Sequence, residues 1–199
     1  MREYRPGDPA RRIDWKATAR RDTVFVRTFD PSVSQRVVIL VECNTSDIDR
    51  WNNRADFLED AITGAASVAV RAIETGCAVG VVVNSNIAGG IAPPVVAPGA
   101  GPDQIAAVMT TLAGATSMTT RPLEEVVARH GAEAMPFGAT IVLIAGVFRP
   151  SVTNFVVDLG RKGHRTLALY VGDDDPPEIP GLPVEDYRGV FAFPEEDDA

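Results

Sequence analysis

The sequence predicts an α/β fold, a doubly wound and mainly parallel sheet flanked by helices on both faces, with an arginine-rich N-terminal extension. Apolar, β-branched runs recur along the chain and are continuous, as in strands that are buried on both faces. Amphipathic helical stretches separate these runs, which is the strand–helix alternation of a parallel sheet. The four predicted central strands are residues 36–43, 77–84, 139–147 and 165–172.

The N-terminal elements come before this alternating region. Residues 1–12 are rich in proline and glycine and predict a loop. A short helix is predicted over 14–21, with Asp14 as its N-cap. The alternating run TVFVRTF, residues 23–29, predicts a strand.

The helices follow from apolar residues at helical spacing. The longest covers residues 52–75, and Gly76 ends it. The prolines within 89–101 exclude a central strand, so this segment predicts a hairpin or an edge strand. YRGVFAF, residues 187–193, predicts a last edge strand. Further helices are predicted over 102–113, 122–130 and 150–162.

Three parts are therefore expected along the 199 residues. Residues 1–34 form the arginine-rich segment with its strand, and 35–193 form the α/β domain. The acidic tail, 194–199, is expected to be disordered. In a doubly wound sheet, functional residues gather in the loops that follow the strands.

Composition excludes several classes of protein. A hydrophobic content of 45% with 23% charged residues is that of an ordinary globular protein. No stretch approaches the roughly 20 apolar residues of a membrane helix. The two cysteines, Cys43 and Cys77, lie in apolar runs and are expected to be buried free thiols, not disulfide or zinc ligands.

Charge is distributed unevenly along the chain. Residues 1–36 hold nine basic and five acidic side chains, whereas 173–199 hold ten acidic side chains and a single basic one. A basic segment can bind nucleic acid, which is one alternative function. However, acids such as Asp8 and Asp14 lie among the arginines, where they would oppose phosphate binding. We therefore favour a segment that folds onto acidic protein surface, and we expect no nucleic-acid partner.

The opening REYRPGDPARRIDWKATARR, followed by VFVRTF, resembles the signature of the bacterial family called domain of unknown function 58. The resemblance implies that this segment leads into a von Willebrand factor A-like domain. It also implies a non-enzymatic protein–protein interaction role beside a MoxR-type AAA+ ATPase. Members carry membrane-spanning helices upstream of the motif, so we expect a fragment or an unanchored form. The full-length protein is then expected at the cytoplasmic face of the inner membrane.

The same resemblance implies a metal-ion-dependent adhesion site, Asp-x-Ser-x-Ser, after the first central strand. The matching residues are Glu42, Asn44 and Ser46, with Thr119 or Thr120 from a later loop. Oxygen ligands of this kind suit Mg²⁺. The first aspartate is replaced by glutamate, and the final aspartate by Ala145-Gly146. We expect a degenerate site, with no cofactor or a weakly bound divalent cation.

The remaining candidate sites concern catalysis. A metal-dependent hydrolase built on Glu42, Asn44, Ser46 and Asp47 is a further alternative. However, no Gly-x-Ser-x-Gly elbow occurs, and His130 and His164 lie near predicted helix ends, where histidines commonly balance the helix dipole.

Trp15 can either pack its basic segment onto the domain or present a contact to a partner, because Trp and Arg are over-represented in interaction hot spots. The candidate partner-binding residues are Arg11, Arg12, Trp15, Lys16 and Arg20.

Overall fold

The computed structural model describes residues 2–3, 24–26, 35–45, 54–119 and 121–187. The chain divides into two compact units, residues 1–34 and 35–199. The predicted helix over 14–21, the acidic tail and the five candidate partner-binding residues lie outside the described residues.

In the first unit, β1 (Arg2–Glu3) pairs with β2 (Phe25–Val26) in antiparallel register, with Arg2 opposite Val26. β2 lies within the predicted strand, but β1 lies in the segment predicted to be a loop, so that prediction was wrong at these two residues. A ladder this short needs only backbone groups to pair. Its two side chains therefore carry no alternating pattern that a sequence could reveal.

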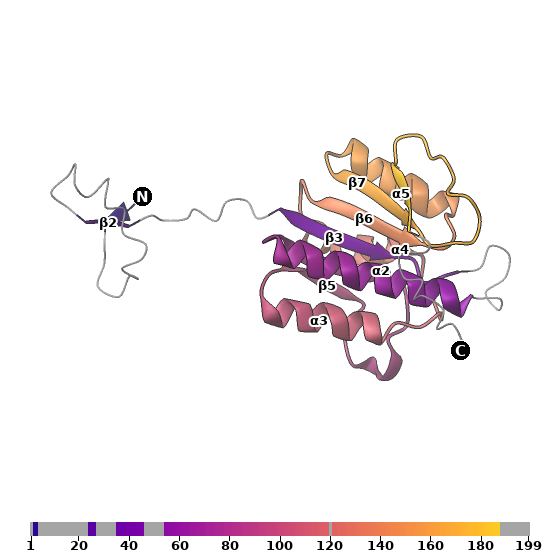
Figure 1. Ribbon diagram of the computed structural model, residues 1–199, viewed down its shortest axis with the longest axis horizontal. Helices are drawn as coiled ribbons and strands as arrows, with labels where there is room; N and C mark the ends of the chain where they lie inside the picture. The colour runs from indigo at the N-terminus through magenta and orange to yellow at the C-terminus, as the bar shows by residue number, and fades with distance from the viewer. Residues whose placement is uncertain (1, 4–23, 27–34, 46–53, 120, 188–199) are drawn as a thin grey trace, which may run out of the picture. The chain divides into compact units, whose positions relative to one another are not determined.

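The described part of the second unit forms a six-stranded sheet in the order β5-β4-β3-β6-β7-β8 (Figure 1). The strands are β3 (Arg36–Val41), β4 (Ala78–Val83), β5 (Val95–Gly99), β6 (Thr140–Ala145), β7 (Arg165–Tyr170) and β8 (Val184–Asp186). All are parallel to their neighbours except β5, which is antiparallel to β4. The predicted α/β fold with a mainly parallel sheet is confirmed.

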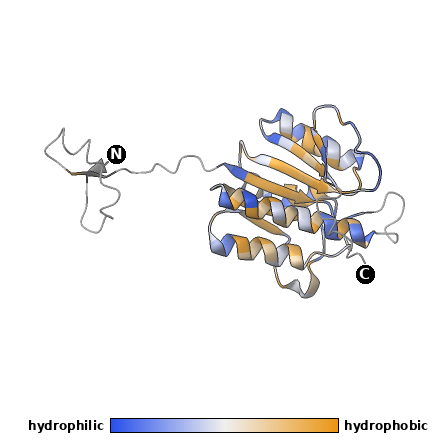
Figure 2. Cartoon of the chain, in the orientation of Figure 1, coloured by the Kyte–Doolittle hydropathy of each residue, from blue (hydrophilic) through white to orange (hydrophobic). Residues whose placement is uncertain are grey.

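Helices cover both faces of this sheet. They are α2 (Ala55–Glu74), α3 (Pro102–Ala113), α4 (Leu123–Ala134) and α5 (Pro150–Arg161). Alternate residues of β3 belong to different cores: Ile39 packs with α2 and α3, whereas Leu40 packs with α4 and α5. Figure 2 shows hydrophobic central strands between helices that also carry hydrophilic residues. No helix within the described ranges is long and apolar enough to cross a membrane.

Two predictions concern where elements end. α4 is assigned through Ala134, but Gly131 has non-helical backbone angles, φ 56° and ψ −143°, so the helix is kinked directly after the predicted end at 130. Among the described residues the last edge strand is β8; Tyr187 follows it outside any strand, and the rest of the strand predicted over 187–193 lies outside the described residues. β8 is short and acidic, so its sequence does not resemble a strand. β5 is an edge strand and contains Pro98, as its prolines predicted.

The order of the strands creates a crevice at the carboxyl ends of the central strands. From β3 the chain continues through α2 to β4 on one side, whereas β6 pairs with β3 on the other side and leads through α5 to β7. At such a topological switch point, the loops after the two central strands separate to opposite faces and leave a crevice between them. The candidate site lies there.

Candidate functional site

A pocket of about 100 Å³ lies where the loops after β3, β4 and β6 meet, and we call it the switch-point pocket. Its lining includes Glu42, Asn44, Asn84, Thr119, Glu124 and Arg149. These side chains come from segments far apart in sequence, and the parallel strands bring the segments together because their carboxyl ends share one edge.

Glu42 follows β3 directly, and its side chain is only 1% exposed. Its Oε1 accepts hydrogen bonds from Asn84 Nδ2 at 2.6 Å and from the Asn44 backbone N–H at 2.9 Å. Its Oε2 has no hydrogen-bond partner within the described structure. Burial raises the pKa of Glu42, while the bonds from Asn84 and Asn44 and the charge of Arg149 oppose that rise and the charge of Glu124 adds to it.

Asn84 holds this carboxylate in place. It follows β4, is 2% exposed, and uses both ends of its side-chain amide. Its Nδ2 donates to Glu42, and its Oδ1 accepts from the Cys43 backbone N–H at 2.8 Å. Asn84 therefore ties the end of β4 to the end of β3. Sequence reasoning pointed to the loops that follow the strands but did not single out this residue.

Arg149 reaches the pocket from the loop between β6 and α5. Its Nη2 donates to the Asn44 carbonyl at 2.7 Å, and its Nη1 lies 3.9 Å from Glu42 Oε1. With 27% of its side chain exposed, the guanidinium forms one wall of the pocket. The sequence analysis did not identify Arg149 as a site residue. Nothing near Arg149 in the chain indicates that it lies beside Glu42, which is more than 100 residues earlier.

Thr119 is brought to the pocket by the backbone. It forms an isolated antiparallel bridge with Ser85, just after β4. The Ser85 hydroxyl fixes this segment further, because it accepts from the Thr116 backbone N–H at 2.6 Å. Glu42, Asn44 and Thr119, three of the predicted metal ligands, thus line one pocket. Ser46, Thr120 and Asp47 lie outside the described residues.

The described donors do not fit a closely coordinated Mg²⁺, which requires near-octahedral oxygen ligands. Glu42 Oε1 already accepts two hydrogen bonds, and the positive charge of Arg149 lies 3.9 Å from it. The final aspartate cannot be restored simply at Gly146, where a Cβ would lie 2.7 Å from the Phe57 ring. Among the residues that are described, no three His, Cys, Asp or Glu side chains gather as a metal cluster.

Cys43, Cys77 and His164 are not among the residues that line the pocket, although the charge of Glu42 acts on the Cys43 thiol. Cys43 and Cys77 are free, Cys43 fully buried and Cys77 partly so. Burial raises the pKa of the Cys43 thiol, which keeps it protonated. His164 precedes β7 at the opposite edge of the sheet, where its Nδ1 lies 3.3 Å from the Ala139 carbonyl.

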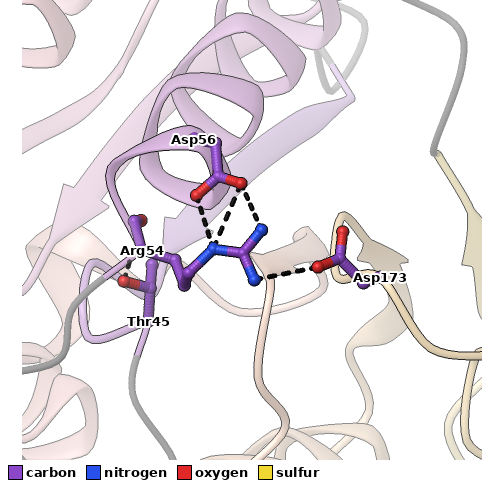
Figure 3. Close-up of polar contacts among 4 residues, drawn as sticks. All are labelled: Thr45, Arg54, Asp56 and Asp173. Carbon is purple, nitrogen blue, oxygen red and sulfur yellow. Dashed lines mark hydrogen bonds and ion pairs between the residues drawn. The ribbon is translucent and has the colours of Figure 1, made fainter.

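A second polar group at the same edge consists of Thr45, Arg54, Asp56 and Asp173, which we call the Arg54 cluster (Figure 3). Arg54 Nη1 lies 2.9 Å from Asp173 Oδ2, and its Nε donates to Asp56 Oδ1 at 2.9 Å. The Thr45 hydroxyl donates to the Arg54 carbonyl at 3.0 Å. The cluster therefore links the loop after β3 and the start of α2 to the loop after β7.

Beside the Arg54 cluster lies a larger pocket of about 410 Å³. Its walls are aromatic and its rim is acidic. Phe148 and Tyr170 are in tilted contact with ring centroids 5.5 Å apart, and the Arg54 guanidinium lies 4.3 Å from the centroid of the Phe57 ring. Asp173–Asp175 form the rim and are exposed.

Comparison with known proteins places this architecture in a family. The model of a family described as "Protein of unknown function DUF58" matches residues 1–186. The chain belongs to this family. The DUF58 match includes the arginine-rich opening and ends at the last residue of β8, so it spans both units and the whole switch-point pocket.

A curated bacterial relative matches part of the chain. This DUF58 chain is 30% identical over 80 residues to "Uncharacterized protein YeaD" of Bacillus subtilis (strain 168). The match covers 40% of this chain and only 18% of that protein. The chain thus corresponds to a small part of its longer relative.

Proposed function

We propose that this DUF58 chain is a non-enzymatic protein-interaction domain, and that a partner inserts one side chain into the switch-point pocket. The observation that carries the proposal is the Glu42 carboxylate, 1% exposed with one oxygen lacking a hydrogen-bond partner in the described structure. Leaving a buried polar group unpaired costs about 1–3 kcal/mol, and more when it is charged. A ligand that supplies the missing bond explains why such a group is present.

The size of the pocket favours a side chain over a small-molecule substrate. Small-molecule sites usually enclose about 300–1,000 Å³, whereas the switch-point pocket encloses about 100 Å³. The buried, protonated Cys43 thiol and the remote His164 support a role without nucleophilic catalysis.

The wider assignment is part of the same proposal. The arginine-rich opening resembles that of proteins with a von Willebrand factor A-like domain, and the strand order of the doubly wound sheet is compatible with it. That resemblance favours a membrane-anchored full-length protein whose partner is a MoxR-type AAA+ ATPase. This domain would contact the partner through the loops at the carboxyl ends of its strands, where doubly wound folds commonly bind their ligands.

Site-specific photo-crosslinking tests the proposal in cells that make the full-length protein. A photoreactive residue replaces Ser151, exposed at the pocket and at the start of α5, or Lys162, exposed at the other end of that helix. We expect a discrete protein adduct from position 151 and little from 162, and mass spectrometry should identify an AAA+ ATPase. Equal labelling at both positions, or none, would contradict the proposal.

A further inference from the structure

Two carboxylates in the switch-point pocket each have an oxygen that the described residues leave unpaired. Glu42 Oε2 and Glu124 Oε2 are both buried and have no hydrogen-bond partner there. Both residues line the pocket, and the charge of Glu124 acts on Glu42. Because buried polar groups are nearly always paired in native proteins, two such oxygens on residues that line one pocket indicate a missing donor.

We infer that the switch-point pocket binds a single primary ammonium group, the end of a lysine side chain of the protein partner. This inference rests on the proposed function and specifies the chemistry of the side chain that enters. It also accounts for the poor fit of the described donors to Mg²⁺.

The charges around the pocket match a monovalent cation. Glu42 and Glu124 contribute two negative charges, and Arg149 contributes one positive charge. Arg121 also lines the pocket, but it forms an ion pair with Glu125 at 4.0 Å. When Glu125 is counted beside Arg121, these five groups together carry a surplus of one negative charge. One ammonium group balances that surplus, whereas a divalent cation would reverse it beside Arg149.

The hydrogen-bonding groups distinguish lysine from arginine. An ammonium group has three donors and no acceptor, and it acts as a compact point charge. Glu42 and Glu124 each offer one unpaired oxygen, so two separate acceptors are present. A guanidinium instead binds best when both oxygens of one carboxylate face its planar fork, and Glu42 Oε1 is already engaged.

The volume of the pocket agrees with this occupant. A single water molecule needs at least about 10–15 Å³, so about 100 Å³ has room for several waters or for an ammonium group with its last methylenes. Val152 and Pro122 also line the pocket and can contact those methylenes.

The test is an NMR titration of the ¹⁵N-labelled 199-residue chain with Nα-acetyl-lysine methylamide. The reporters are the Asn84 side-chain amide and the Asn44 backbone amide, because both donate to Glu42. We expect saturable shifts of both signals. Acetylation of the probe's Nε, which removes its charge, should weaken binding by about tenfold or more. Mg²⁺ alone should bind more weakly than the lysine probe.

Two matched variants locate the effect on α4. Glu124→Gln removes one of the two unpaired carboxylates and should weaken lysine-probe binding by about tenfold. Glu133→Gln makes the same change on an exposed residue of the same helix and should leave binding unchanged. The remaining amide signals report in each variant whether the fold is intact.

Several results would overturn the inference: no shift with the lysine probe, equal shifts with its acetylated form, or tighter binding of Mg²⁺ at the same two signals. Crosslinking at Ser151 without any lysine response would leave the proposed function standing and contradict only the binding of an ammonium group. A lysine response without crosslinking would leave an ammonium-binding pocket but contradict the proposed protein-interaction role.

Discussion

The switch-point pocket and the Arg54 cluster lie at the same edge of the sheet and use the same chemistry, arginine beside carboxylate, in different surroundings. In the pocket, Glu42 is 1% exposed and Asn84 is 2% exposed. In the cluster, the side chains of Arg54, Asp56 and Asp173 are 45%, 55% and 67% exposed. Water and salt screen the cluster, whereas the pocket's groups depend on one another.

The two regions also show that the larger pocket is not the one with the unpaired buried groups. The larger pocket, about 410 Å³, is lined by the exposed Arg54 cluster, whose polar groups are solvated or paired. The smaller one, about 100 Å³, holds the buried carboxylate oxygens that lack partners in the described structure. The unpaired buried group, and not the volume, therefore supports the switch-point pocket as the proposed binding site. The predictions below test whether the two regions differ as this requires.

The largest effect is expected for Asn84→Ala. Removing this amide leaves the Cys43 N–H and Glu42 Oε1 without their shared partner inside the protein. Such losses cost about 3 kcal/mol in unfolding free energy, which urea denaturation followed by circular dichroism measures. Asn86→Ala is the matched control, because Asn86 is exposed. Similar losses in both variants would show that the pocket is not held together as described.

A smaller loss is expected for Gly146→Ala, at the loop after β6. A Cβ there would lie 2.7 Å from the side chain of Phe57, the ring that lies against the Arg54 guanidinium. Overpacking of this kind costs about 2 kcal/mol. Gly160→Ala is the control, since its Cβ meets the Thr166 hydroxyl at 3.3 Å and alanine favours the helix. Thermal melts of both variants compare the two sites.

Much of this architecture could be predicted from the chain itself. Continuous apolar runs revealed β3, β4, β6 and β7, and the prolines of residues 89–101 placed β5 at an edge. β8 was missed because a three-residue strand gains its stability from pairing with β7 and not from its own side chains.

The site was predictable only in part, for a related reason. The family resemblance singled out Glu42, Asn44 and Thr119, and all three line one pocket in the structure. Asn84 and Arg149 were not predicted, because their roles depend on side-chain directions across 42 and 105 residues of sequence. A polar residue directly after a continuous apolar strand, as Asn84 is, was the one signal that could have identified it.

The pH dependence of stability should report the buried carboxylate. Burial raises the pKa of folded Glu42 above its ordinary value of 4.5. Its protonated form therefore stabilises the fold below pH 4.5, and this contribution is lost as pH rises through the raised pKa. Glu42→Gln keeps the shape without the charge, so its unfolding free energy should rise relative to the wild type between pH 4.5 and neutrality. Parallel curves for the two proteins would contradict the raised pKa.

The smallest effect is expected for Arg54→Ala. Because these ion pairs are exposed, stability should fall by less than in Gly146→Ala, and the loss should disappear in concentrated NaCl. Arg54 lowers the pKa of Asp56. The Arg54–Asp56 pair therefore stabilises the folded protein above pH 3.8, and this stabilisation is lost as the pH falls through the lowered pKa. Arg71→Ala, which breaks one exposed pair with Glu74 on the same helix, is the control. If Arg54→Ala remained costly at high salt, packing against Phe57 and not charge would hold this edge of the sheet together.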